Sequence, residues 1–276
     1  MNTALPDISA QEIAELAEAV MENPGFDFSA YSKASLKRRI VRVMMIRKLS
    51  FSDLKHQLVN NPDFFQDFLE EVTVNVTEMF RDPTFYRALA NDIIPHLAAL
   101  QQVKIWSAGC ASGEEAYSFA ILMDQSGLKN KTFISGTDVN RSVLKEAQKG
   151  SYSSRSMKTN ADNYRACGLP GSLNDYFTTS YDTMSIHSEW KQNVLFSVHN
   201  LVSDAVFDVF NLISCRNVFI YFETSLQEQI LDVFYRSLRP NGYLCLGSKE
   251  TIRTDRFKKR FKPVNTQENI YQKIDF

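Results

Sequence analysis

A short turn of small residues followed by two carboxylates is the part of this sequence best suited to chemistry. Residues 103–106 alternate as a strand does, residues 107–113 are mostly small, and a helical pattern then opens with Glu114 and Glu115. A strand that breaks at glycine before a helix lets a ligand approach bare backbone at the helix N-terminus. Two carboxylates there would repel a phosphate but suit a ligand with a sulfonium and an amino group. The turn therefore points to S-adenosylmethionine, although such turns also occur where a helix only packs on a sheet.

Further polar residues follow other predicted strands. Residues 133–138 form a β-rich run that ends in Asp138. In nucleotide-binding α/β folds, a carboxylate at the end of the second strand accepts hydrogen bonds from ribose hydroxyls. The alternative is that Asp138 caps the helix predicted to begin near Arg141. Asn200 follows the predicted strand 194–198 and could address an adenine edge or cap its own loop, whereas Arg216 and Asn217 follow the most apolar run.

The elements that must position these residues fall into two patterns. Residues 8–70 show helical spacing of apolar residues, with helices centred near residues 16, 40, 54 and 68. From about residue 100, β-rich runs (103–106, 132–137, 194–198, 206–214, 242–246) alternate with helical ones (115–125, 142–148, 225–238). This alternation predicts a doubly wound α/β sheet. We expect a helical domain at 1–74, a linker at 75–95 that contributes to the ligand site, and the α/β domain at 96–276 with an insertion at about 150–193.

Composition narrows the class of protein. The chain has 276 residues, 44% of them hydrophobic and 23% charged, which is ordinary for a soluble globular protein. No apolar run could span a bilayer and no secretory signal is evident, so we expect a cytoplasmic protein without membrane insertion. The four cysteines are scattered without a CxxC pair, so no metal site is expected. For the four histidines we expect surface or capping roles.

Several strings together resemble one family. They are NVTEMFRD at 75–82, WSAGCASGEEAYS at 106–118, the strand end at Thr137-Asp138, CRNVFIYF at 215–222 and GYLCLGSKE at 242–250. In this order they resemble the CheR family, the glutamate O-methyltransferases of chemotaxis receptors, from about residue 30 to the C-terminus. The resemblance implies a Rossmann-like methyltransferase fold, with S-adenosyl-L-methionine as methyl donor and S-adenosyl-L-homocysteine as product.

The resemblance also implies roles for individual residues. The residues expected to contact the cofactor are Asn75, Thr77, Arg81, Glu115, Asp138, Asn200, Leu201, Arg216 and Asn217. Arg81 and Tyr221 are expected to border the transferred methyl and the incoming carboxylate. The chemistry agrees, because a glutamate with a pKa of about 4.3 is already a nucleophile at neutral pH and needs no general base. The enzyme must instead desolvate the carboxylate and align it with the methyl carbon.

A basic segment indicates the kind of partner. Residues 28–52 contain no acidic residue but several basic ones, of which Lys37, Arg38 and Arg42 cluster away from the apolar stripe of their predicted helix. Nucleic acid is one possible partner for such a run. In the CheR family the equivalent helix docks on the cytoplasmic helical bundle of the receptor, so we favour methyl-accepting chemoreceptors. A second basic run at 253–262 is expected to be a solvated helix face.

The sequence departs from the family pattern at one place. Some members tether a receptor C-terminal peptide through an antiparallel insertion with a glycine-rich loop, whereas residues 177–196 here contain no glycine. A strand pair is possible between 176–179 and 193–198, but docking is expected to rest on the helical domain alone, with the protein acting as a monomer. Two other functions stay open: a nucleic-acid methyltransferase, and a non-catalytic signalling module that binds S-adenosylmethionine. The sequence shows no base-flipping motif, which disfavours the nucleic-acid methyltransferase. The presence of Arg81 and Tyr221 disfavours the non-catalytic module.

Overall fold

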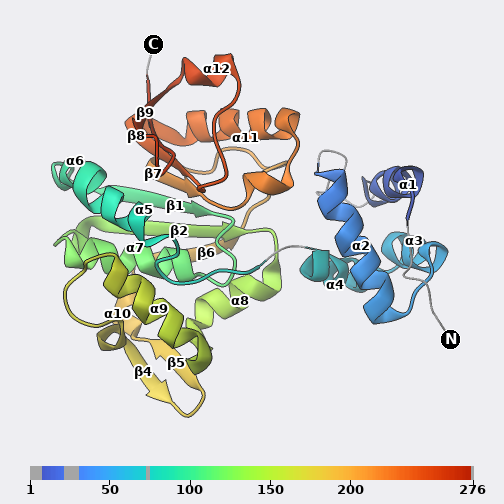
Figure 1. The fold of residues 1–276 in the computed structure, drawn as a ribbon, viewed down its shortest axis with the longest axis horizontal. Coiled ribbons are helices and arrows are strands. Elements are labelled where there is room, and N and C mark those ends of the chain that lie inside the picture. Colours follow the sequence, from blue (N-terminus) through green and yellow to red (C-terminus); the bar gives the residue numbers. More distant parts are fainter. Residues whose placement is uncertain (1–7, 22–30, 73–74, 275–276) are drawn as a thin grey trace. The chain divides into compact units, whose positions relative to one another are not determined.

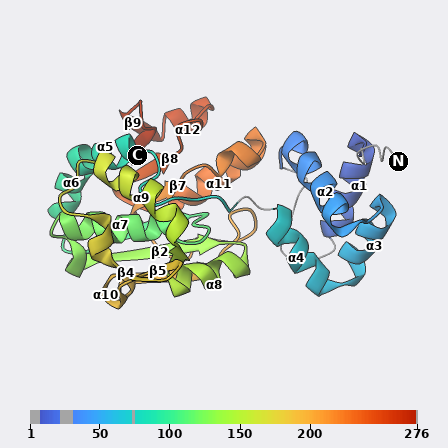
Figure 2. The ribbon, with the colours of Figure 1, turned by 60° about the horizontal axis from the view of Figure 1, so that its bottom comes forward.

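The computed structural model describes residues 8–21, 31–72 and 75–274, which form two compact units (Figures 1 and 2). The helical unit is assigned Met1–Val74, Asn200–Asp204 and Phe219–Ile230, and the sheet unit is assigned the rest. Among the described residues, no helix is long and apolar enough to cross a lipid bilayer.

The helical unit contains α1 (Ala10–Met21), α2 (Lys33–Arg47), α3 (Phe51–Asn60) and α4 (Pro62–Val72), in agreement with the predicted spacing. Its core is built from the apolar positions of each helix, which include Ile13, Leu16, Val20, Leu36, Ile40, Val43, Leu54, Leu58, Phe65, Phe68 and Leu69. Ser50 starts α3 with a capping box, in which the side chains of Ser50 and Asp53 each accept a hydrogen bond from the other's backbone N–H. Residues 23–25 are Asn-Pro-Gly, a sequence that predicts the end of the first helix, but they lie outside the described residues.

The sheet unit is built on a mostly parallel sheet with the strand order β6-β2-β1-β7-β8-β10-β9. These strands are β1 (Val103–Ala108), β2 (Thr132–Asp138), β6 (Val194–Val198), β7 (Phe210–Cys215), β8 (Leu238–Leu246), β9 (Phe261–Asn265) and β10 (Ile270–Lys273). β6, β2, β1, β7 and β8 pair in parallel, and β10 is antiparallel to both β8 and β9. Its helices are α5 (Pro83–Ala88), a π-helix (Leu89–Ile93), α6 (Ile94–Ala98), α7 (Glu114–Gln125), α8 (Arg141–Lys149) and α12 (Asp255–Lys258). The helix α11 (Thr224–Ser237) is divided: residues 224–230 are assigned to the helical unit and residues 231–237 to the sheet unit. The predicted Rossmann-like fold is confirmed.

The segment expected to be a linker, residues 75–95, contributes to the core of the sheet unit. Met79 and Phe80 are fully buried, and Phe85 and Tyr86 are 1% exposed. The Phe80 ring packs at 5.0 Å from the ring of Tyr86. This burial fixes the backbone on both sides of Arg81. The Arg81 side chain therefore extends from a well-packed segment and not from a loose connection.

The insertion forms a separate antiparallel sheet of β3 (Ser151–Ser153), β5 (Thr183–Ile186) and β4 (Phe177–Ser180). It also holds α9 (Ser154–Ala166), a 3-10 turn (Leu173–Tyr176) and α10 (Ser188–Lys191). The expected pairing of residues 176–179 with 193–198 is wrong. β4 pairs with β5 through a tight turn, while β6 pairs in parallel with β2 at the edge of the main sheet. A nearby turn allows β4 a local partner, which costs less chain entropy than a distant one.

Candidate functional site

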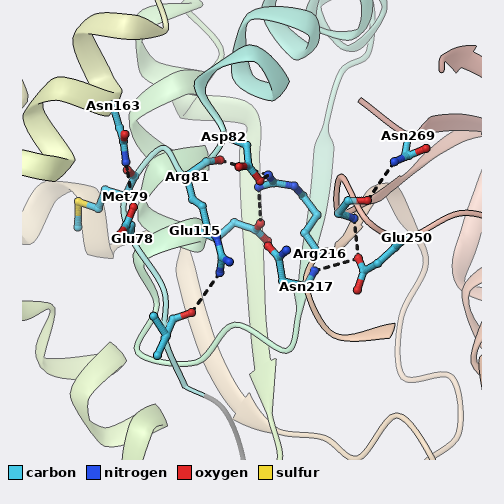
Figure 3. Close-up of polar contacts among 12 residues, drawn as sticks. Glu78, Met79, Arg81, Asp82, Glu115, Asn163, Arg216, Asn217, Glu250 and Asn269 are labelled. Carbon is cyan, nitrogen blue, oxygen red and sulfur yellow. Dashed lines mark hydrogen bonds and ion pairs between the residues drawn. The ribbon is translucent and has the colours of Figure 1, made fainter. Parts of the chain in front are cut away.

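Arg216 is the centre of a charged cluster at the ends of β1 and β7 (Figure 3). Its guanidinium donates to Asp82 Oδ2 at 2.6 Å, to Glu115 Oε2 at 3.2 Å and to the Arg81 carbonyl at 3.2 Å. It also lies 3.9 Å from the centroid of the Phe85 ring, and its side chain is 3% exposed. Burial alone would lower the pKa of Arg216, but the carboxylates of Glu115 and Asp82 raise it overall. The cluster therefore holds a fixed charge inside the protein.

The backbone around Arg81 explains how Asp82 reaches this cluster. Phe80 and Asp82 adopt left-handed conformations, with φ of 53° and 59°. Asp82 occupies the N-cap of α5 and Pro83 follows it, yet the Asp82 side chain makes no cap hydrogen bond and pairs with Arg216 instead. Asp normally caps a helix at this position. The ion pair with Arg216, which is distant in the sequence, has thus replaced the local cap hydrogen bond.

The two carboxylates of the turn after β1 have different environments. Glu115 accepts a hydrogen bond from Ser107 Oγ at 2.8 Å in addition to its pair with Arg216. Glu114 is 8% exposed and accepts from Ser112 Oγ at 2.8 Å. Burial raises the pKa of Glu114 to about 7. The sequence suggested that both would face a ligand, but burial of Glu114 leaves Glu115 as the carboxylate suited to that role.

The glycines of the turn have a packing role. Gly109 has φ of 77°, and a Cβ there would meet Val218 Cγ2 at 2.6 Å. Gly113 has φ of 92°, and a Cβ there would lie 2.9 Å from side-chain atoms of Ala147 and Phe196. Both positions therefore exclude a side chain because the chain itself packs closely. The carboxylates, rather than the glycines, support the ligand assignment.

Asp138 is held at the end of β2 by backbone groups. Its carboxylate accepts from the N–H of Ala111 at 2.9 Å and from the N–H of Asn140 at 3.0 Å. The helix α8 is capped by Asn140, which accepts from the N–H groups of Ser142 and Val143, so the capping interpretation of Asp138 is wrong. Burial raises the pKa of Asp138. A carboxylate offers about four acceptor sites, so acceptor capacity remains on Asp138 for a ribose hydroxyl.

The remaining cofactor residues predicted within the sheet unit have varied surroundings. Arg81 is half-buried and donates to the Val76 carbonyl at 3.2 Å, while Asn75 and Thr77 precede it, also half-buried. Asn217 is left-handed, with φ of 62°, and its N–H donates to Glu250 Oε2 at 2.9 Å. The same Glu250 oxygen accepts from the N–H of Gly247, and Glu250 is 4% exposed. Asp82 and Glu250 were not predicted as site residues, although both lie inside strings that mark the family.

Other predicted residues belong to the helical unit. Asn200 and Leu201 are buried, and Asn200 Oδ1 accepts from the N–H of Val202 at 2.9 Å, so the loop-capping interpretation of Asn200 is confirmed without excluding a ligand. Tyr221 ends a 3-10 turn, Phe219–Tyr221. On α2, Arg38 and Arg42 are exposed and Lys37 is half-buried.

For His199, the surface role expected of the histidines is wrong, whereas the expected capping role agrees with the contact of its Nε2 with the Ala205 carbonyl at 3.2 Å. His199, in the sheet unit, is 6% exposed, and its ring packs edge-on at 5.3 Å from the ring of Trp106. Because Trp106 stands at the centre of an aromatic cluster, the imidazole serves as a core ring rather than a surface group.

Comparison with known protein families identifies the family of this chain. The family model described as "CheR methyltransferase, SAM binding domain" matches residues 75–270, and "CheR methyltransferase, all-alpha domain" matches residues 11–73. The chain belongs to the CheR methyltransferase family. It is therefore a methyltransferase that uses S-adenosylmethionine.

Individual relatives agree with this family over almost the full chain. A Pseudomonas putida protein described as methyltransferase Cher3 is 39% identical over 95% of this chain and 96% of its own length. The chemotaxis protein methyltransferase of Listeria monocytogenes is 30% identical over 90% of this chain and 92% of its own length. That of Vibrio parahaemolyticus is 30% identical over 91% and 94%.

Proposed function

We propose that this methyltransferase transfers the methyl group of S-adenosylmethionine to glutamate side chains of chemoreceptors in the cytoplasm, which gives glutamate 5-O-methyl esters for chemotactic adaptation. The observation that supports this most is the contrast between two arginines. Arg216 is saturated by the carboxylates of Glu115 and Asp82. Arg81, whose backbone carbonyl touches Arg216, forms no ion pair with a carboxylate among the described residues. A second, uncompensated guanidinium beside the cluster suits an incoming carboxylate.

The residues present fit the cofactor. Asp138 offers acceptor capacity at the end of β2, where a ribose would lie, and Glu115 offers a carboxylate for the positively charged methionine end. The proposed set is completed by Asn75, Thr77, Arg81, Asn200, Leu201, Arg216 and Asn217. When bound, S-adenosylmethionine supplies a methyl group on a sulfonium, which a carboxylate oxygen can accept directly as the carbon–sulfur bond breaks.

The residues proposed as catalytic have no proton to move. A glutamate carboxylate is ionised at neutral pH, and its methyl ester is neutral, so charge is lost in the transfer. Arg81 would bind one carboxylate oxygen and leave the other for the methyl carbon. Tyr221 would orient the same group through its hydroxyl. Such positioning can lower the activation free energy on the order of 7 kcal/mol when the reacting groups are well aligned.

The helix α2 is the proposed docking surface for the receptor. Arg38 and Arg42 lie one turn apart on its exposed side. An acidic helical bundle complements this charge. Nucleic acid would complement the positive charge of α2 equally well. The substrate therefore has to be identified from the methylated product.

The test is to incubate the protein with radiolabelled S-adenosylmethionine and a receptor cytoplasmic fragment, and then to treat the product with alkali. Esters hydrolyse in base, so label that is transferred to the receptor and released as methanol supports glutamate methylation. A receptor fragment with glutamine at the acceptor positions is the control and should stay unlabelled. Alkali-stable label on DNA or RNA would establish the nucleic-acid alternative. Cofactor binding without transfer to any of these substrates would favour the non-catalytic signalling module.

A further inference from the structure

The segment that contains Tyr221 is bound to the two residues just before α2. The N–H of Ser32 donates to the Tyr221 carbonyl at 2.8 Å. Tyr31 and Phe222 form an isolated antiparallel bridge, and their rings meet edge-on at 5.0 Å. Gln227 Nε2 donates to the carbonyls of Phe219 and Phe222, at 2.9 and 3.0 Å. The backbone at Tyr221 is therefore held by residues just before α2 and by Gln227 of α11.

The side chain of Tyr221 meets an arginine of the same helix. The guanidinium carbon of Arg39 lies 5.1 Å from the centroid of the Tyr221 ring, a cation–π contact. Arg39 Nη1 donates to the carbonyl of Val72, the last residue of α4, at 2.6 Å, and Nε donates to Ser35 Oγ at 3.4 Å. A guanidinium held by two further partners offers a fixed surface on which the phenol ring can rest.

Arg39 differs from its neighbours on α2. Arg38 and Arg42 are exposed, whereas Arg39 is half-buried. Burial lowers the pKa of Arg39, the interaction with Tyr221 opposes this shift, and the charges of Arg38 and Arg42 add to it. Of these three arginines, Arg38 and Arg42 can therefore meet a partner, whereas Arg39 faces the chain itself.

We infer that Arg39 is a positioning residue that sets the orientation of the Tyr221 hydroxyl, so that the proposed docking helix also aligns a proposed catalytic side chain. This inference rests on the function proposed above for α2 and Tyr221. It predicts that a receptor that displaces α2 alters the rate of transfer as well as the strength of binding.

The test compares Arg39→Leu with Arg42→Leu, which removes the same charge from an exposed position of the same helix. Arg39→Leu should lower kcat for the receptor on the order of 10- to 100-fold, as misplaced catalytic groups do, with little change in the KM for receptor or the Kd for S-adenosylmethionine. Arg42→Leu should raise the KM and leave kcat near the original value. A rise in KM at unchanged kcat for Arg39→Leu would make Arg39 a receptor contact and overturn the inference.

A double-variant cycle separates positioning from general damage. In a Tyr221→Phe background, which keeps the ring but removes the hydroxyl, Arg39→Leu should cause little further loss of kcat. Full additivity of the two losses would contradict the proposed link. If Arg39→Leu melts early because its bond to Val72 is lost, Arg39→Lys provides the second variant, since it keeps the charge without the planar fork. It should show a smaller loss of kcat that also disappears in the Tyr221→Phe background.

A spectroscopic measurement tests the contact without any assay of methylation. In protein labelled with 3-fluorotyrosine, the fluorine signal absent from Tyr221→Phe identifies Tyr221. That signal should move in Arg39→Leu and stay in place in Arg42→Leu. An unmoved signal in Arg39→Leu would overturn the inference even if receptor methylation is established. A moved signal in a protein that does not methylate receptors would support the contact while the proposed function fails.

Discussion

Arg216 and Asp82 form an ion pair of 2.6 Å in which the arginine side chain is 3% exposed and the aspartate is 37% exposed. The pair joins the segment before α5 to the end of β7, and through Arg216 it reaches Glu115. A buried charge whose partner is removed is strongly unfavourable, whereas an exposed pair contributes little. The cluster is therefore a sensitive element of the sheet unit.

Arg216→Leu should destabilise the protein by about 3–5 kcal/mol, because it leaves the carboxylates of Glu115 and Asp82 without their cation. Urea unfolding measures this change. Arg256→Leu is the matched control, since Arg256 pairs with Asp232 at 2.8 Å but is 53% exposed. It should cost no more than about 1 kcal/mol. Equal losses in the two variants would show that burial does not strengthen the Arg216 pairs.

Asp138→Ala should weaken S-adenosylmethionine binding by about 1–3 kcal/mol, because it removes the acceptor proposed for the ribose hydroxyls. Calorimetric titration measures the affinity. Asn140→Ala is the control, because Asn140 caps α8 and should affect stability by about 1 kcal/mol rather than affinity. Unchanged affinity in Asp138→Ala would remove this residue from the site.

Arg81→Lys should lose most activity although the charge is kept, because lysine lacks the planar fork that can bind a carboxylate and a carbonyl together. Steady-state kinetics with receptor fragment measures the loss. Arg87→Lys, on the exposed side of α5, should keep full activity. Full activity in Arg81→Lys would reduce Arg81 to a general positive charge.

Glu114→Gln should change how stability depends on pH. The folded pKa of Glu114, about 7, lies above its ordinary value of 4.5, so the folded protein keeps a proton that the unfolded chain releases between these pH values. The wild-type protein therefore loses stability as pH rises through this window, by roughly 3 kcal/mol at most from this group. The glutamine variant lacks this loss and should melt higher than wild type at pH 8 but not at pH 4. Glu223→Gln, at an exposed position, should leave the difference between the two pH values unchanged.

Reversing Arg38 and Arg42 to glutamate should raise the KM for receptor and leave cofactor affinity intact. Their contribution is mostly long-range attraction, which is screened over about 8–10 Å near physiological ionic strength. Rising salt should therefore have the same effect on the unmodified protein. Reversing Lys258 and Lys259, exposed cations of the second basic run, is the control and should leave the KM unchanged. If the α2 variant methylates receptor normally but no longer binds DNA or RNA, the nucleic-acid alternative replaces the receptor.

The elements of the fold could be predicted because their apolar spacing is regular. The strand 132–137 and the helix 142–148 match β2 and α8 to within one residue at each end. The strand predicted at 206–214 begins only at Phe210, because apolar content alone does not show where pairing starts. The hairpin of the insertion was missed because residues 177–186 are too polar to mark two strands.

The site could be predicted in part. Glu115, Asp138 and Arg216 could be predicted as site residues because each lies just after a predicted strand or at its end, and each lies in a string that resembles the family. The burial of Glu114 and the pairing of Asp82 with Arg216 could not be predicted, because both depend on contacts between segments far apart in the sequence. The same holds for Tyr221 and Arg39, which are far apart in the sequence and meet where Tyr31 and Ser32 pair with the Tyr221–Phe222 segment.

The four cysteines can report transient opening of the sheet unit but not of the helical unit. Cys110, Cys167, Cys215 and Cys245 are free and buried, and all lie in the sheet unit, while residues 1–74 contain none. Burial raises the pKa of every one of these thiols, that of Cys167 to about 12, so little reactive thiolate forms while the unit stays closed. Alkylation of the native protein thus proceeds through transient opening of the sheet unit, and its rate, compared with and without S-adenosylmethionine, reports how far the ligand suppresses that opening.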